Sequence, residues 1–122
     1  MNTARNLLVI LMAAAVLTGC RTTVRTDAVS GNLPMVLDRH DVYAVDKLYG
    51  TDEADALSES ATVRATMEAN AGGHMPAAIN SVVVAVLDRH DGWVRTDANI
   101  PNLDRAVFLD SAQALRLLFR PE

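Results

Sequence analysis

The sequence predicts an all-α fold: a small four-helix bundle built from two duplicated helical hairpins. Three observations support this. Beyond residue 32, apolar residues recur at the three- and four-residue spacing of a helix face. One hexapeptide occurs twice, with its two copies 50 residues apart. Glycine and proline residues fall at intervals that would separate four helices.

The first nineteen residues have the pattern of a secretory signal peptide. Arg5 supplies a positive charge, and an apolar run extends over residues 7–16. This run of about ten residues is too short to span a bilayer, which takes about twenty. It fits the apolar core of a signal peptide, so we exclude residues 1–19 from the fold.

The apolar run ends in Leu17-Thr18-Gly19-Cys20, which resembles the lipobox of bacterial lipoproteins. The resemblance implies cleavage before Cys20 and attachment of diacylglycerol to its thiol. It also implies acylation of the new amino group by a fatty acid such as palmitate. The alternatives are an ordinary signal peptide, cut near Ala13–Ala15, or a short buried helix, and in either the cysteine would occur by chance.

The same resemblance implies an address in the cell envelope. Arg21 follows the cysteine, whereas an Asp at this position favours the inner membrane of Gram-negative bacteria. In such a host we expect a lipid-anchored protein of the outer membrane that faces the periplasm. Its expected partners are the membrane, through the lipid on Cys20, and an envelope protein.

Size and charge limit the function of the remaining 103 residues. These 103 residues suffice for one small domain. The net charge of the whole chain is −4, and it becomes −5 without Arg5. An acidic chain with few aromatic side chains is a poor candidate for binding nucleic acid. Cys20 is the only cysteine, so no disulfide is expected within one molecule.

We expect residues 20–31 to form a polar lipidated tether and residues 32–122 to form the duplicated helical domain. The first hairpin begins this domain. Its first helix runs from about 33 to 49, with Pro34 in the first turn and Gly50 as its end. Thr51 or Asp52 is expected to cap the second helix, which continues to about residue 70. The first repeat therefore covers about 32–70.

The second hairpin follows a glycine-rich break at residues 71–76 and covers about 77–120. Its first helix is expected at about 77–98, because the helical period extends beyond the β-branched stretch at 82–86. Pro101 opens the last helix, which is expected to end near residue 119, before Pro121.

The repeated hexapeptide is the main candidate for a functional site. Val36-Leu37-Asp38-Arg39-His40-Asp41 recurs at residues 86–91, and an aromatic residue follows each copy at the same offset. After a two-residue shift, the downstream helices also align and place Arg64 on Arg116. Such an internal repeat indicates duplication of one hairpin.

A helical wheel directs the polar residues of both copies toward the bundle interior. His40 and His90 lie at the centre of the apolar arcs, and their Arg and Asp neighbours border these arcs. We expect the copies to pair about a pseudo-two-fold axis, with the Arg of one meeting the Asp of the other. The predicted cluster comprises Arg39, His40, Asp41, Arg89, His90 and Asp91.

Three functions are considered for this cluster. It could be a structural polar cluster that fixes the register between the two halves. It could be a divalent-metal site, because imidazole and carboxylate suit zinc or iron, although no same-helix His-x-x-x-His spacing is present. It could also be an acid–base catalyst, with a nucleophile recruited from Ser58, Ser60 or Ser111.

The sequence therefore favours a lipid-anchored envelope lipoprotein with a structural or protein-interaction role. No catalytic pattern and no cofactor motif stands out, so we predict that it is not an enzyme and uses no cofactor. One alternative is a metal- or small-ligand-binding module centred on His40 and His90. Another is a phage- or plasmid-encoded envelope lipoprotein of the spanin or exclusion type.

Overall fold

Four long helices in two hairpins dominate the computed structural model, which describes residues 23–120. The first hairpin consists of α3 (Leu33–Lys47) and α4 (Gly50–Ala69), and the second of α5 (Asn80–Thr96) and α6 (Asn102–Leu118). The predicted all-α fold is confirmed. The predicted signal peptide and Cys20 lie outside the described residues.

Short elements close one end of the bundle. Strand β1 (Val24–Arg25) leads into α2 (Thr26–Val29), while β2 (His74–Met75) and a 3-10 turn, η1 (Ala77–Ile79), precede α5. The two strands pair antiparallel, with Val24 opposite Met75. The backbone N–H of Thr26 also donates to the carbonyl of Gly73, at 2.9 Å. The chain before the first hairpin is thus fastened to the connection between the two hairpins.

The prediction of a tether over residues 20–31 is wrong from Val24 onward. Val24 and Val29 are 4% and 0% exposed, and both belong to the hydrophobic core. The polar composition of the segment concealed two valines that reach the core from different elements, Val24 from β1 and Val29 from the end of α2. Burial of a valine side chain stabilises the fold by about 1.5–3 kcal/mol.

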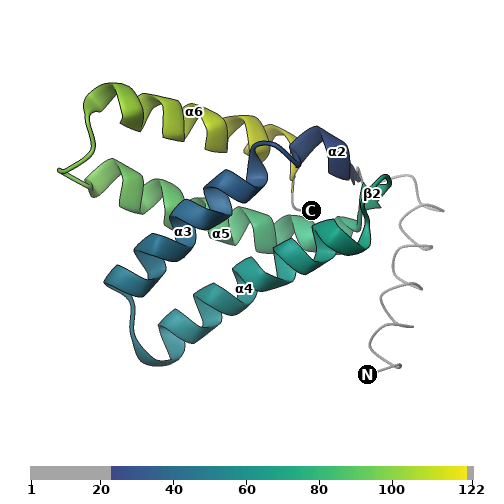
Figure 1. Cartoon of the computed structure of the whole chain (residues 1–122), viewed down its shortest axis with the longest axis horizontal. Helices are drawn as coiled ribbons and strands as arrows, with labels where there is room; N and C mark the ends of the chain where they lie inside the picture. Colours follow the sequence, from purple (N-terminus) through teal and green to yellow (C-terminus); the bar gives the residue numbers. More distant parts are fainter. Residues whose placement is uncertain (1–22, 121–122) are drawn as a thin grey trace.

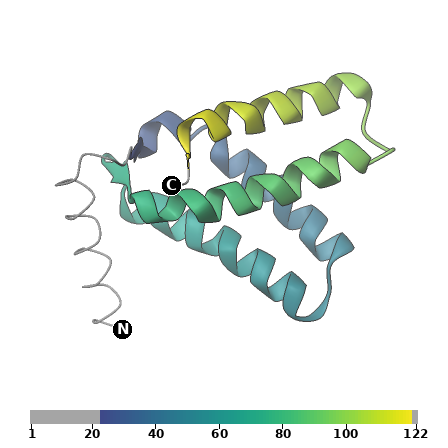
Figure 2. The ribbon, with the colours of Figure 1, turned by 180° about the vertical axis from the view of Figure 1, so that it is seen from behind.

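The equivalent helices α3 and α5 cross at the centre of the molecule, with α6 on one side and α4 on the other (Figure 1, Figure 2). The turns that join the helices of each hairpin lie at one end of the bundle. Strand β2, helix α2 and the end of α6 lie at the opposite end. We call these the turn end and the sheet end.

The helix boundaries agree with the prediction to within three residues, but the turn between α3 and α4 differs. Gly50 has a positive φ of 63° and is the first residue of α4, with Tyr49 extended before it. Thr51 and Asp52 lie inside the helix, and no side chain caps it. The left-handed backbone at Gly50, which a glycine adopts without strain, reverses the chain in their place.

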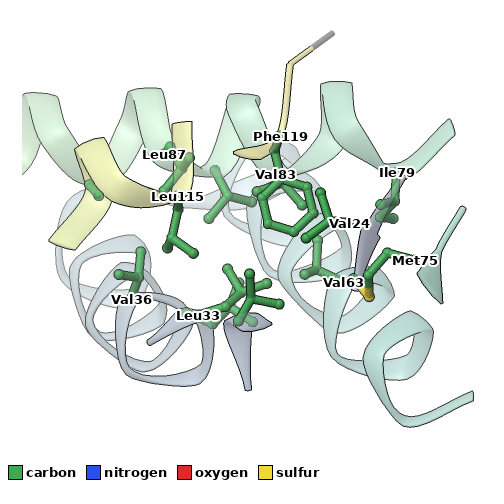
Figure 3. Packing of buried hydrophobic residues seen from close by; sticks show 14 residues of the cluster. Val24, Leu33, Val36, Val63, Met75, Ile79, Val83, Leu87, Leu115 and Phe119 are labelled. Atoms are coloured by element: carbon green, nitrogen blue, oxygen red, sulfur yellow. The ribbon is translucent and has the colours of Figure 1, made fainter. Parts of the chain in front are cut away.

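The hydrophobic core lies between the four helices and extends to the sheet end (Figure 3). Phe119, just beyond α6, is fully buried, and its ring lies beside Val83 and Val24 in Figure 3. The stretch at residues 82–86 is helical, as predicted. None of the helices within residues 23–120 is both long enough and apolar enough to cross a membrane.

Candidate functional site: a reciprocal histidine cluster

Both repeated histidines lie at the centre of the bundle. His40 on α3 and His90 on α5 are each 0% exposed. Val36 and Leu37 precede His40 on the same buried face, and Val86 and Leu87 do so for His90. The predicted inward direction of the two imidazoles is confirmed, because the apolar arcs that contain them pack against each other.

The two copies exchange hydrogen bonds across the bundle. Arg39 donates through Nη1 to Nε2 of His90, at 3.0 Å. Arg89 donates through Nε to Nε2 of His40, at 3.1 Å. Arginine has no acceptor, so each imidazole Nε2 must accept through its lone pair. The exchange is reciprocal, as a two-fold relation between the copies requires.

The partner of each arginine differs from the prediction. We expected the Arg of one copy to meet the Asp of the other, but it meets the His of the other copy. Each carboxylate stays within its own copy. Nδ1 of His40 donates to Oδ1 of Asp41 at 2.9 Å, and Nδ1 of His90 donates to Oδ1 of Asp91 at 2.8 Å.

These contacts define the protonation of both rings. A ring whose Nε2 accepts from arginine carries its proton on Nδ1, where it donates to the carboxylate. Both imidazoles are therefore neutral in this arrangement. Burial lowers the pKa of His40, and the charge of Arg89 lowers it further against the raising effect of Asp41.

Arg64 and Arg116 on the outer helices complete the cluster. Arg64 on α4 donates to Asp41 and Asp38, each at 2.9 Å. Arg116 on α6 donates to Asp91 through Nε and Nη2, at 3.1 and 2.9 Å, and pairs with Asp88 at 2.8 Å. Neither arginine was among the predicted site residues, although the repeat alignment already placed one on the other.

The carboxylates are held ionised by these donors. Burial by itself would raise the pKa of Asp41, but its hydrogen bonds to Arg64 and His40 outweigh burial and lower it. Burial likewise opposes a net lowering of the pKa of Asp91, which results from its bonds to His90 and Arg116. Each copy is thus a hydrogen-bonded chain, Arg–Asp–His, whose neutral imidazole accepts from the arginine of the other copy.

The contacts of the inner arginines, Arg39 and Arg89, differ between the two copies. The guanidinium carbon of Arg39 lies 3.5 Å from the centroid of the Phe108 ring on α6. No such ring contact is found for Arg89 within residues 23–120, and Arg89 pairs instead with Glu59 on α4, at 2.8 Å. One arginine is therefore held by an aromatic face and the other by a carboxylate.

Tyr43 and Trp93, the aromatic residues that follow the two hexapeptides, pack together over the cluster. Their ring centroids are 5.9 Å apart, and the Trp93 centroid lies 5.6 Å from that of His40. The Tyr43 hydroxyl donates to Oδ2 of Asp97 at 2.7 Å. Burial and this carboxylate raise the pKa of Tyr43 to about 12.

The geometry favours a structural cluster over metal binding or catalysis. An imidazole needs a free lone pair to bind a metal ion or to act as a general base. In this cluster both Nε2 lone pairs already accept a hydrogen bond from arginine. Within residues 23–120, no group of three or more His, Cys, Asp or Glu side chains is arranged to hold a metal ion. Over the same residues, no hydrogen bond joins Ser58, Ser60 or Ser111 to either imidazole.

The site is therefore recognised from the duplication inside the chain and from its hydrogen bonds. Comparisons with protein-family models, with curated proteins and with solved structures find nothing that matches this chain.

Proposed function

We propose that this protein is a lipid-anchored envelope lipoprotein with a structural or protein-interaction role and no catalytic activity. The observation that carries the anchoring is the Leu17-Thr18-Gly19-Cys20 sequence at the end of a short apolar run. A lipid-modifying enzyme needs the thiol of Cys20, and small residues before it give a peptidase access to the backbone.

The position of the folded domain supports this proposal. Val24 is buried in the core and lies only four residues after Cys20. Since an extended chain covers about 3.3–3.6 Å per residue, lipid on Cys20 would hold β1 within about 14 Å of the membrane surface. The sheet end would then face the bilayer, and the turn end would face away from it.

The histidine cluster supports a binding or scaffolding role rather than an enzymatic one. Both ring nitrogens of His40 and His90 have partners within the protein. A buried network of this kind is worth most when every member is satisfied, because an unpaired polar group in a core costs about 1–3 kcal/mol. The cluster thus fixes how the two hairpins meet and leaves outer surfaces for a partner.

The anchoring is tested by mass spectrometry of the protein made from its full precursor in a Gram-negative bacterium. We expect an N-terminus at Cys20 that carries a diacylglyceryl group and an amide-linked fatty acid. Cys20→Ser should remove the lipid and leave residues 1–19 attached. A lipid-free protein with a different N-terminus would overturn the proposal.

The matched control for that experiment is Thr22→Ser. This substitution alters a hydroxyl residue two positions after Cys20, outside the four-residue lipobox pattern. It should leave cleavage and lipid attachment unchanged. Loss of lipid in this variant as well would mean that the Cys20 result reports poor expression rather than loss of the acylated thiol.

A further inference from the structure

The surroundings of the two inner arginines differ toward the turn end. The helix pairs α3/α6 and α5/α4, which the duplication makes equivalent, both diverge toward that end (Figure 1, Figure 2). In the first pair, the Phe108 ring of α6 lies against Arg39 of α3. In the second pair, Arg89 of α5 and the first half of α4 border a pocket of about 590 Å³. Sites for small ligands have volumes of about 300–1,000 Å³, so this pocket has room for an aromatic ring.

The pocket lies at the position that corresponds to the Phe108 ring. The offset between the copies is 50 residues from α3 to α5 and 52 from α4 to α6. The structure confirms this register, because the arginines of α4 and α6 bind equivalent carboxylates. Phe108 then corresponds to Ala56, whose side chain is a single methyl group. Both Ala56 and Arg89 line the pocket. One copy therefore fills with its own ring a position that the other copy leaves open.

The guanidinium of Arg89 keeps a face for such a ring. Its Nε donates to His40 at 3.1 Å, and its Nη2 pairs with Glu59 at 2.8 Å. Both contacts use N–H groups, which lie in the plane of the guanidinium. The side chain is 28% exposed, and within residues 23–120 no ring lies over its face. Arg39 combines a bond to histidine with a ring over the face, so the two contacts are compatible.

The charge of the pocket wall indicates what accompanies the ring. The charged residues that line the pocket are Asp52, Asp55, Glu59 and Arg89. Glu59 pairs with Arg89, whereas neither aspartate lies within ion-pair distance of an Arg or Lys side chain among residues 23–120. The positive end of α4 offsets about half a charge. The one lysine of the chain, Lys47, does not line the pocket. The wall is therefore net negative and attracts a cation.

We propose that this pocket binds an aromatic side chain of an envelope partner protein, in a segment where a Lys or Arg neighbours the aromatic residue. The ring takes the position over Arg89 that Phe108 has over Arg39. The cation binds Asp52 and Asp55. This inference rests on the interaction role proposed above, but not on the lipid anchor.

A second copy of this chain is a weaker candidate for the occupant. Its Tyr49 is 85% exposed and lies at the turn end. However, residues 46–55 around this tyrosine have four carboxylates and one lysine. Insertion of Tyr49 would therefore bring an acidic segment against an acidic wall, and like charges repel.

The test is a titration with short peptides that have blocked ends. The probe is Gly-Ser-Lys-Phe-Lys-Ser-Gly. A second peptide has Leu in place of Phe, and a third has Glu in place of each Lys. The protein is used as the cell makes it, in phosphatidylcholine nanodiscs if it carries lipid and in buffer if it does not. The 15N chemical-shift changes of the protein give the affinity and the site.

We expect the Phe peptide to bind with a dissociation constant of roughly 1 mM. The shift changes should lie in the first half of α4 and at the Nε–H of Arg89, whose proton signal should move upfield under the ring. The Leu peptide should bind roughly threefold more weakly, because it has no π face. The Glu peptide should not bind.

The substitution that fills the pocket is Ala56→Phe, which gives the first copy the ring of the second. It should abolish binding of the Phe peptide. The matched control Ala61→Phe places the same ring at an exposed position of α4 and should bind as the unaltered protein does. Circular dichroism verifies that both variants fold.

Because Ala56 is buried, a second pair of variants tests the site without a change in the core. D52N/D55N removes two exposed, unpaired charges from the wall and should weaken binding of the Phe peptide roughly fivefold. The matched control D104N/D110N makes the same change of charge on α6 and should leave binding unaltered.

Five results would overturn the inference: no binding of the Phe peptide, equal binding of the Phe and Leu peptides, equal binding of the Phe and Glu peptides, shift changes away from α4 and Arg89, or no effect of D52N/D55N. Unaltered binding by folded A56F would do so as well. Self-association that Tyr49→Ser abolishes would assign the pocket to a second copy. Mass spectrometry reads the lipid independently, so failure of the anchoring proposal is distinguishable from failure of this one.

Discussion

The two copies of the histidine cluster use the same contacts at different depths in the protein. The side chain of Asp91 is 4% exposed, whereas that of its equivalent Asp41 is 28% exposed. Asp91 accepts two hydrogen bonds from Arg116, and Asp41 accepts one from Arg64. The two copies thus have the same order of Arg, Asp and His contacts, but Asp91 is more deeply buried than Asp41.

This difference indicates where the network matters most for stability. A charge pair that loses one partner costs more when water cannot replace that partner. The second copy should therefore contribute more stability than the first, although both have the same residues. The reciprocal bonds between Arg and His make the two contributions interdependent, since each arginine belongs to one copy and serves the other.

The largest effect is expected from Asp91→Asn, compared with its matched partner Asp41→Asn. The first substitution removes a buried charge from between His90 and Arg116 and should reduce the free energy of unfolding by about 3–5 kcal/mol. The second should cost about 1–2 kcal/mol, because water reaches the site. Urea denaturation measures both. Equal losses, or a larger loss for Asp41→Asn, would refute the comparison.

A smaller effect is expected from Phe108→Leu, which removes the aromatic face beneath Arg39. The leucine keeps most of the apolar contact but has no π face, so the loss should be about 1 kcal/mol. The loss should persist at 1 M salt, because Arg39 interacts with a ring and not with an exposed carboxylate. A loss that disappears in salt would mean that Arg39 is held by other charges.

Mild acid should weaken the fold through His40. Its pKa is below the ordinary value of 6.5 in the folded protein, chiefly because the ring is buried. The unfolded chain therefore binds the proton more readily, and the stability from the neutral ring is lost as pH falls below about 6.5. We expect a lower melting temperature at pH 5 than at pH 7.5.

The melting temperature should fall again at more acidic pH, where Asp41 and Asp91 become protonated. The pKa values of Asp41 and Asp91 are below 3.8, so their contribution is complete above that pH and is lost on further acidification. His40→Gln should remove the loss between pH 7.5 and 5 that this ring causes and keep the loss below pH 4. Equal melting temperatures of the unaltered protein at pH 5 and 7.5 would contradict the account of a buried neutral imidazole.

The smallest effect is expected from Glu59→Gln, which removes the carboxylate partner of Arg89. Both side chains are about one-third exposed, so the pair should contribute at most about 1 kcal/mol. Unlike the loss in Phe108→Leu, this one should vanish at 1 M salt. A salt-independent loss above 2 kcal/mol would show that the two inner arginines are held in equivalent ways.

Local patterns predicted the helices and the direction of the histidines. The period of apolar residues around His40 determines which side of α3 is buried, and that side contains the ring whatever the neighbouring helix is. Glycine and proline residues marked the ends of the helices in the same local manner. These features follow from residues that are close together in the sequence.

The hydrogen-bond partners could not be predicted in this way. Neighbouring residues on a helix do not ordinarily face each other, so a wheel gives no reason to join His40 to Asp41. A wheel also shows the direction of a side chain but not how far it extends, and the long Arg39 side chain reaches from α3 to His90 on α5. The buried Val24 and Val29 were missed because a tether was inferred from the polar residues around them.

The central claim is that each arginine donates to the imidazole of the other copy. Long-range 1H–15N NMR of the histidine rings tests it most directly, because it identifies which ring nitrogen carries the proton. We predict that at pH 7 both His40 and His90 are neutral, with the proton on Nδ1 and a bare Nε2. A proton on Nε2 of either ring at that pH would contradict the reciprocal cluster.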